Sequence, residues 1–170
     1  MKRLWRETVF VRLWALRHVR LLWFVQPSVL ELDDQRCVIR IPLTWRTRNH
    51  LHSMYFGVLA VGADCAGGLM AMRRIGQRDK RISLIFKDVR AEFLKRAEGH
   101  VHFTCEDGAA IAALVDRVAT SGERGNLPVR IVATVPASFG DEAVARFELT
   151  LSLKRSTARG ATAVAVKHDS

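Results

Sequence analysis

The fold is decided by the segment Met54-Tyr55-Phe56-Gly57-Val58-Leu59-Ala60-Val61-Gly62-Ala63-Asp64-Cys65-Ala66-Gly67-Gly68-Leu69-Met70-Ala71-Met72. Asp64 is the only charged residue in this segment. An apolar run of this length is typical of a helix rather than a strand. Because a helix that is apolar on all sides is buried on all sides, the sequence predicts a long central helix that the rest of the chain encloses.

Two faces of this predicted helix carry side chains of different size. Small residues and the one carboxylate fall on a narrow stripe: Gly57, Ala60, Asp64, Gly67 and Ala71. Larger apolar residues fall on the adjoining face: Val58, Val61, Cys65, Leu69 and Met72. The stripe predicts that another backbone approaches the helix closely. Since the flanking strands cover only part of the helix, we also expect a second copy to cover it, in a homodimer or a dimer of dimers.

Segments with strand character flank the central helix. Residues 28–42 predict a hairpin with its turn at Asp33-Asp34-Gln35, followed by a loop from Thr44 to His50. Further strands are predicted over 81–89, 91–96, 100–105, 129–135 and 143–154. A short helix is predicted over 109–119, with Asp107 as its N-cap and Gly122 as its end.

This order of elements predicts an α+β fold in which an antiparallel sheet wraps around the central helix. We expect an N-terminal basic helix over 1–26, one domain over 27–154 and a flexible tail over 155–170. The central segment is also long enough to span a membrane. However, Asp64 in mid-span would cost roughly 2.5–3.5 kcal/mol, and amphipathic strands on both sides favour a soluble domain.

The charge of the chain favours a polyanionic partner, and its cysteines favour a reducing compartment. The 170 residues carry a formal net charge of +10, which favours association with nucleic acid, anionic lipid or a phosphate-rich ligand. The three cysteines, Cys37, Cys65 and Cys105, are far apart in the sequence and form no CxxC pair. We interpret them as small buried hydrophobes and expect a cytoplasmic protein. No nucleic-acid-binding motif is apparent, so we do not expect nucleic acid as a partner.

The basic N-terminus has two interpretations. Arginines interrupt its apolar residues, which makes it a poor match to a signal peptide or a membrane span. On a helical wheel, Arg3, Arg6, Arg17 and Arg20 fall near one side, whereas Trp5, Leu16, Val19 and Trp23 lean to another. The segment is either a helix packed on the domain or a helix that brings residues 1–25 into peripheral contact with an anionic membrane.

The spacing of three residues resembles that of a known family. Asn49, Gly57 eight residues later and Asp64 seven residues after that resemble the hotdog-fold acyl-CoA thioesterases, nearest the phenylacetate-pathway type. Residues 93–99, Phe-Leu-Lys-Arg-Ala-Glu-Gly, resemble the Phe-Leu-Arg-Pro-Ala…Gly turn of the same families. The resemblance covers about residues 28–154 and extends to an uncharacterised, thioesterase-like branch.

The resemblance implies a hotdog fold and hydrolysis of an acyl thioester. It implies that the backbone N–H of Gly57, at the positive end of the helix, holds the thioester carbonyl. Asp64 would act as general base or nucleophile on a carbonyl held by the partner subunit's helix, and Asn49 would orient water or the carboxylate. From the residues alone, Asp64 is equally a buried acid that caps a backbone N–H or pairs with an arginine.

The chain departs from the family at the entrance of the helix. Active thioesterases have His-Gly where this chain has Tyr55-Phe56 before Gly57. We expect Tyr55, Phe56 and His50 to lie at the mouth of the ligand site. The bulky pair Tyr55-Phe56 either narrows an acyl pocket, or the Tyr55 hydroxyl replaces the polar group that is missing at this position. The alternative function is therefore a non-catalytic acyl- or lipid-binding module, with membrane association through the N-terminal helix.

Two basic residues are candidates for carrier recognition. Lys95 and Arg96 occupy the family's turn, and we expect them to bind the phosphates of coenzyme A, which enters as part of the substrate and not as a separate cofactor. His50 and His52 have no acidic partner spaced to complete a metal site, which needs three or four ligands. We therefore expect no metal.

Overall fold

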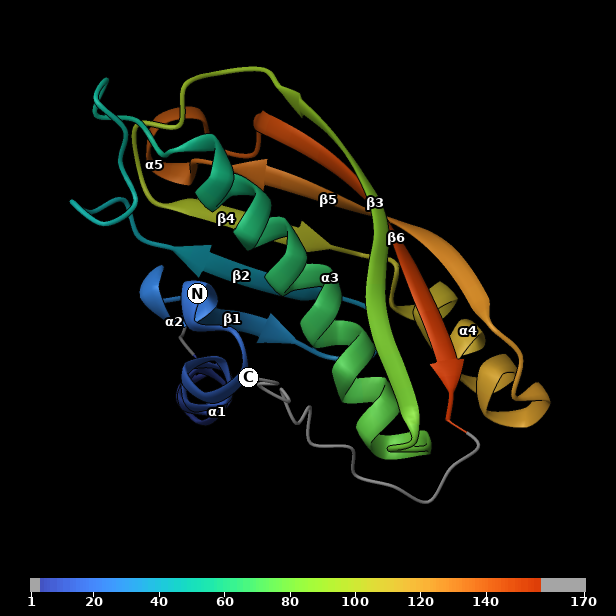
Figure 1. Cartoon of the computed structure of the whole chain (residues 1–170). Helices are drawn as coiled ribbons and strands as arrows, with labels where there is room; N and C mark the ends of the chain where they lie inside the picture. Colours follow the sequence, from blue (N-terminus) through green and yellow to red (C-terminus); the bar gives the residue numbers. More distant parts are fainter. Residues whose placement is uncertain (1–3, 157–170) are drawn as a thin grey trace, which may run out of the picture.

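The computed structural model describes residues 4–156 and has the predicted α+β architecture (Figure 1). Its helices are α1 (Trp5–His18), α2 (Arg20–Phe24), α3 (Phe56–Arg78), α4 (Gly108–Ser121) and α5 (Pro136–Phe139). Its strands are β1 (Ser28–Leu32), β2 (Cys37–Ile41), β3 (Ile82–Phe93), β4 (Val101–Cys105), β5 (Gly125–Thr134) and β6 (Ala143–Arg155). The expected tail lies outside the described residues, except for Arg155 and Ser156.

The strands form one antiparallel sheet in the order β1-β2-β4-β5-β6-β3. The sheet curves around α3, which runs across its concave side, while α4 packs near one end (Figure 1). Residues that alternate along the central strands face α3 and are fully buried: Ile39, Val101, Phe103, Val129, Ile131 and Leu151. This period of two is why the sequence predicted these strands.

The segment after α3 differs from its prediction. Two strands were expected over 81–89 and 91–96, but β3 is a single strand whose pairing with β6 shifts register between Phe86 and Val89. A bulge of this kind inserts residues into the pleat and interrupts the alternation of side chains. The interruption in the sequence pattern therefore marks a bulge and not the end of a strand.

Helix α1 packs beside β1 through specific polar contacts. The backbone N–H of Val29 donates to Thr8 Oγ1 over 2.9 Å, and Arg12 Nε donates to the carbonyl of Pro27 over 2.8 Å. Thr8, Val11 and Ala15 are buried beneath the helix. The chain breaks at Val19, so the predicted N-terminal helix is two helices, α1 and α2.

The structure shows which side of the predicted N-terminal helix packs on the domain. Trp5 and Leu16, which lean to a different side of the wheel from the arginines, are both exposed, as are Arg6 and Arg17. Arg3 lies outside the described residues. The helix packs through the smaller residues described above, and the Arg12 contact with Pro27 holds that side against the domain. Aromatic and basic residues therefore share one exposed face.

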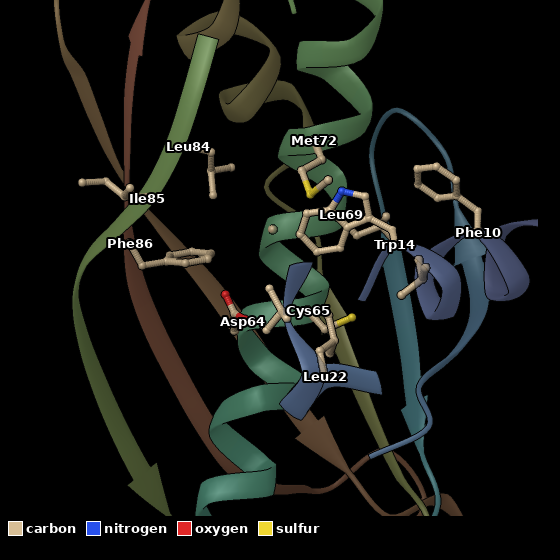
Figure 2. Close-up of a pocket in the computed structure, with 13 residues that line it drawn as sticks. Phe10, Trp14, Leu22, Asp64, Cys65, Leu69, Met72, Leu84, Ile85 and Phe86 are labelled. Atoms are coloured by element: carbon tan, nitrogen blue, oxygen red, sulfur yellow. The ribbon is translucent and has the colours of Figure 1, made fainter. Parts of the chain in front are cut away.

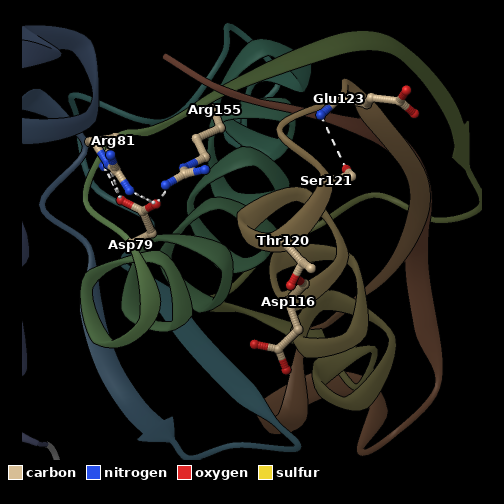
Figure 3. Close-up of polar contacts among 7 residues, drawn as sticks. All are labelled: Asp79, Arg81, Asp116, Thr120, Ser121, Glu123 and Arg155. Carbon is tan, nitrogen blue, oxygen red and sulfur yellow. Dashed lines mark hydrogen bonds and ion pairs between the residues drawn. The ribbon is translucent and has the colours of Figure 1, made fainter. Parts of the chain in front are cut away.

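A carboxylate at the end of α3 joins three parts of the chain. Asp79 Oδ1 accepts hydrogen bonds from the backbone N–H and the Nε of Arg81, and Asp79 Oδ2 accepts from Arg155 Nε over 2.8 Å (Figure 3). The hydrogen bonds from Arg81, followed by that from Arg155, hold the pKa of Asp79 well below its ordinary value. The contact ties the beginning of β3 to the end of β6.

The ends of α4 agree only in part with the prediction. Gly122 ends the helix in the left-handed region, with φ of 74°, as expected of a C-terminal glycine. Asp107 occupies the N-cap position, but its side chain caps no helical N–H. Instead, Asp107 Oδ2 accepts a hydrogen bond of 2.6 Å from the backbone N–H of Arg130 in β5. Asp107 therefore attaches α4 to the sheet.

The small residues of α3 allow close packing against the sheet. A Cβ added to Gly62 would overlap the ring of Phe103 in β4. A Cβ added to Gly67, in the predicted stripe, would meet Val129 Cγ2 at 3.4 Å. In this protomer Gly67 therefore faces side chains of the sheet and not another backbone. Among the α3 glycines, Gly62 lies closest to a side chain of the sheet, and Gly62 is outside the predicted stripe.

We predict opposite effects for two substitutions in α3. Gly62→Ala should lower the free energy of unfolding by about 1–3 kcal/mol, because the methyl group overpacks the core against Phe103. Gly76→Ala should raise it by about 0.5–1 kcal/mol, since Gly76 is exposed with nothing within 4 Å of the added Cβ and alanine favours the helix. Urea denaturation measures both, and equal effects of the two substitutions would contradict this account of the packing.

Candidate functional site

Asp64 is a half-buried carboxylate in the middle of α3. Within residues 4–156 of one protomer it forms no hydrogen bond and no ion pair. Burial alone raises its pKa above the ordinary value of 3.8, with no cation nearby to oppose the shift. The structure thus provides, within the protomer, neither the arginine partner nor the capping contact that a purely structural acid would have.

An apolar pocket of about 250 Å³ begins at Asp64 (Figure 2). Figure 2 shows Asp64 at one end of the pocket and Met72 two turns farther along α3, with Leu84 and Phe86 of β3 on one side and Phe10 and Trp14 of α1 on the other. The remaining wall residues are Val11, Val19, Leu22, Cys65, Gly68, Leu69 and Ile85. Asp64 is the only charged residue that residues 4–156 contribute to this wall.

A second, more open hollow adjoins Asp64 on the other side of Phe86. Its volume is about 430 Å³, and its wall includes Ala60, Val61 and Asp64 of α3 together with Lys87 and Val89 of β3. Asp64 and Phe86 line both cavities. The carboxylate therefore lies between the apolar pocket and a more open surface along β3.

The entrance of α3 carries the predicted residues in a compact aromatic cluster. The helix begins at Phe56, so Gly57 lies in its first turn. The rings of Tyr55 and Phe56 are 4.7 Å apart, and the ring of Phe93 lies 6.3 Å from that of Phe56. A Cβ added to Gly57 would lie 2.6 Å from Tyr55 Cε1. A side chain at position 57 would therefore displace the Tyr55 ring, which lies against Gly57.

Asn49 organises the loop before α3. Its Oδ1 accepts hydrogen bonds from the backbone N–H of Leu51 over 2.9 Å and from the N–H and hydroxyl of Ser53 over 3.3 Å. Asn49 lines neither cavity that contains Asp64. Within one protomer the structure therefore does not bring Asn49 and Asp64 together.

The candidate carrier-binding residues lie at the surface near the same loop. Lys95 Nζ is 2.6 Å from Glu142 Oε1, and Arg96 pairs with Glu98 over 3.0 Å. Arg96 also donates to the carbonyl of Leu51 over 2.7 Å. Because exposed ion pairs are weak, both cations remain accessible to a phosphate. His50 and His52 are exposed in this loop.

The cysteines lie in the core and not at a reactive surface. Cys37 and Cys105 face each other on β2 and β4, and both are buried and free, as is Cys65. Burial raises the pKa of the Cys105 thiol to about 11, so this thiol stays protonated at neutral pH. The pairing of Cys37 with Cys105 depends on strand order, which their sequence positions do not indicate.

Among the described residues, no group of three metal-ligating side chains occurs.

One family model covers most of the chain. It is described as a domain of unknown function, DUF4442, and it matches residues 10–153. The chain belongs to the DUF4442 family. A search of curated proteins gives no match.

Several solved structures share the fold of this DUF4442 protein. A protein of unknown function from Chlorobaculum tepidum TLS has a TM-score of 0.76 at 12% identity, over 89% of this chain and 96% of that one. A Pseudomonas aeruginosa protein described as a probable thioesterase has a TM-score of 0.70 at 20% identity, over 88% and 96%. A thioesterase from Haemophilus influenzae has a TM-score of 0.63 at 12% identity, over 85% and 89%.

These comparisons confirm the predicted hotdog fold. Burial explains the apolar character of α3, the one described helix that is long and apolar enough to cross a membrane. More than half of its most apolar window is buried inside the protein, where the sheet surrounds it. The sequence did not predict that α1 supplies Phe10 and Trp14 to the pocket, because this depends on how α1 packs beside β1.

We predict that Asp64→Asn stabilises the fold at pH 7. Because burial raises the pKa of Asp64, its ionised form costs stability at any pH above that raised pKa. The cost disappears below the unfolded pKa of about 3.9, where the carboxyl is protonated in both states. The melting temperature of Asp64→Asn should therefore exceed that of the unsubstituted protein at pH 7, and the difference should shrink toward pH 3.

Thermal melts followed by circular dichroism across this pH range measure the difference. Asp116→Asn is the matched control, since Asp116 pairs with Arg74 over 3.2 Å and with Arg78 over 2.9 Å and should give no stabilisation. An Asp64→Asn protein that melts no higher than the unsubstituted protein at pH 7 would show that the carboxylate has a partner in solution.

Proposed function

We propose that this DUF4442 protein hydrolyses an acyl thioester, with Asp64 as general base or nucleophile. The observation that carries the proposal is a half-buried carboxylate at the end of an apolar pocket, without an ion-pair partner among residues 4–156. Burial raises the pKa of this group, which makes it a stronger base near neutral pH. Thioesterase descriptions among the structural relatives support the same reaction class.

The apolar pocket suits the acyl chain of the substrate. A cavity of roughly 150 Å³ accommodates benzene, so a volume of about 250 Å³ corresponds to an acyl segment of about ten carbons. With the chain in this pocket, the thioester group lies at Asp64. In the base-catalysed form of the reaction, Asp64 removes a proton from water and the oxygen of that water attacks the carbonyl carbon. The carbon–sulfur bond then breaks, and the thiolate takes up a proton as it leaves.

The oxyanion needs a donor that Asp64's own helix does not place nearby. Gly57 lies seven residues before Asp64, which is about 10 Å along the axis of α3. One thioester carbon cannot be close to both groups of the same helix. We therefore propose that Gly57 of a second protomer supplies the N–H, and that Asn49 of that protomer orients the water or the carboxylate.

The free edge of β3 is the surface that would bring the second protomer into place. β3 is the last strand in the sheet order, so its outer edge has no strand partner in the described protomer. Ile85, Val89 and Phe93 along this strand are 54%, 59% and 49% exposed. A long apolar edge of this kind invites pairing with another strand. We propose a homodimer joined along β3, either alone or within a dimer of dimers.

Coenzyme A is the carrier that we propose. Lys95 and Arg96 lie beside the loop that contains His50, and their pairs with Glu142 and Glu98 are exposed. A phosphate can replace these carboxylates because guanidinium and ammonium groups donate well to either anion. We further propose a cytoplasmic location, which is supported by three cysteines that are free and buried.

We predict that purified protein hydrolyses medium-chain acyl-CoA and that Asp64→Asn lowers kcat by about 100-fold or more, the usual effect of losing a general base. Thiol release measured with a chromogenic disulfide reports the reaction across a panel of acyl lengths. Asp116→Asn on α4 is the control and should retain full activity (Figure 3). Equal rates for the unsubstituted protein and Asp64→Asn would remove Asp64 from catalysis.

A non-catalytic acyl-binding module is the second candidate, favoured by the ring of Tyr55 over Gly57. In that case a non-hydrolysable acyl-CoA analogue would bind by calorimetry while no thioester in the panel is cleaved.

We predict that Val89→Asp separates the dimer into monomers and abolishes hydrolysis, because a buried charge would oppose pairing along β3 and the site needs both protomers. Size-exclusion chromatography with light scattering should give about two or four times the chain mass of 19.1 kDa for the unsubstituted protein, and half of that mass for the variant. Val132→Asp on β5 is the matched control, since Val132 is 37% exposed but lies away from the free edge. A monomer with full activity would contradict the two-protomer site.

A further inference from the structure

The outer surface of α1 and α2 exposes large apolar side chains that the proposed reaction does not use. On α1, Trp5, Leu13 and Leu16 are 71%, 63% and 45% exposed. On α2, Leu21 and Phe24 are 59% and 38% exposed. Exposed apolar patches of this kind mark interaction sites in soluble proteins. We call this surface, together with its cations described next, the N-terminal face.

The cations of the two helices lie on the same surface. At about 100° per residue, Arg6 and Arg17 fall beside the arc of α1 that contains Trp5, Leu16 and Leu13, and they lie opposite the buried Thr8 and Ala15. Arg6, Arg17 and Arg20 are exposed, and none of them forms an ion pair among the described residues. Glu7 is the only acidic residue between positions 4 and 26, and it is half-buried. The face is therefore basic as well as apolar.

A loop beyond β2 extends this face. The ring of Phe24 lies 6.5 Å from that of Trp45, at right angles to it. The guanidinium of Arg46 lies 5.6 Å from the Phe24 ring and 5.2 Å from the Trp45 ring. Trp45 is 71% exposed. An exposed tryptophan beside an arginine is the combination that membrane interfaces favour, because the ring lies at headgroup level while the cation binds phosphate.

Charge distinguishes the occupants that this face could take. Two copies of a face with several arginines and one half-buried acid would repel each other. The free edge of β3 already offers a surface for self-association on another side of the molecule. An anionic bilayer provides both the phosphates for the arginines and the apolar depth for Trp5, Leu13 and Leu16.

We propose that the N-terminal face docks the protein on an anionic lipid surface. The helices lie parallel to the bilayer, with their aromatic rings among the headgroups and their arginines on lipid phosphates. Lys2 and Arg3 precede the described residues in the sequence and add to the positive charge of the same segment. The net charge of +10 favours the same negatively charged leaflet.

Vesicle co-sedimentation of the full-length protein tests this proposal. The protein should sediment with phosphatidylcholine vesicles that contain phosphatidylserine, remain in solution with phosphatidylcholine alone, and dissociate as salt is raised. Arg17→Ala/Arg20→Ala should weaken binding by about 25-fold, since each arginine near an anionic surface accounts for about fivefold. Leu13→Ser/Leu16→Ser should weaken it by about tenfold or more through lost apolar burial.

A control with the same loss of charge separates a specific face from general attraction. Lys80→Ala/Arg117→Ala removes two exposed cations that lie outside the N-terminal face, and its binding should equal that of the unsubstituted protein. Circular dichroism checks that each variant is folded. The proposal is wrong if neutral and anionic vesicles bind equally, if neither binds, or if the control weakens binding as much as Arg17→Ala/Arg20→Ala.

Light scattering tests whether the face belongs to a second copy. Leu13→Ser/Leu16→Ser should leave the mass of the assembly unchanged while it weakens vesicle binding. A variant that changes mass and still binds vesicles normally would assign the face to self-association and overturn the proposal. These readouts do not involve thioester hydrolysis, so their outcome is independent of the proposed enzyme activity.

Discussion

The enclosure of α3 by the sheet is the constraint on which the rest of the structure depends. The helix lies close to β4 because Gly62 has no side chain where the Phe103 ring packs. That approach places Asp64 in surroundings that raise its pKa and leaves a pocket between α3, β3 and α1. Packing that is tight at Gly62 and open near Gly68 thus positions both the acid and the space that an acyl chain would fill. A carboxylate in such surroundings costs stability, which is a common property of catalytic groups.

The sequence predicted those elements that local chemistry determines. The apolar run around Asp64 predicted the central helix, the turn at Asp33 predicted the first hairpin, and Gly122 predicted the end of α4, all of which the structure confirms. Contacts between distant segments were not predictable in the same way. The face on which α1 packs depends on hydrogen bonds from Val29 and Arg12, which only the folded chain brings together. Likewise, the helical wheel of α3 identified a stripe of small residues but not Gly62, because the position of Phe103 depends on strand order.

The candidate site was predicted to a similar extent. The resemblance to the hotdog-fold thioesterases singled out Gly57 and Asp64, and the structure places them in the first turn and the middle of one helix. The sequence could not predict that α1 forms a wall of the pocket. It also could not predict that the Asn49 side chain accepts hydrogen bonds within its own loop. The separation of Gly57 and Asp64 along α3 is the physical reason that a second protomer enters the proposed mechanism. A single chain carries both groups that the proposed mechanism uses, but their separation prevents it from presenting them to one carbonyl.

The N-terminal face and the apolar pocket meet at α1. Phe10 is 57% exposed at the surface of this helix and also lines the pocket that ends at Asp64, as does Val19 where α1 and α2 separate. A protein seated on lipid through α1 would therefore hold the wall of its pocket against the bilayer. An acyl chain that partitions into the headgroup region would then pass from one apolar environment to another without full exposure to water. The same short helix thus joins the two proposals, since it forms a wall of the pocket on one side and carries the basic and aromatic residues on the other.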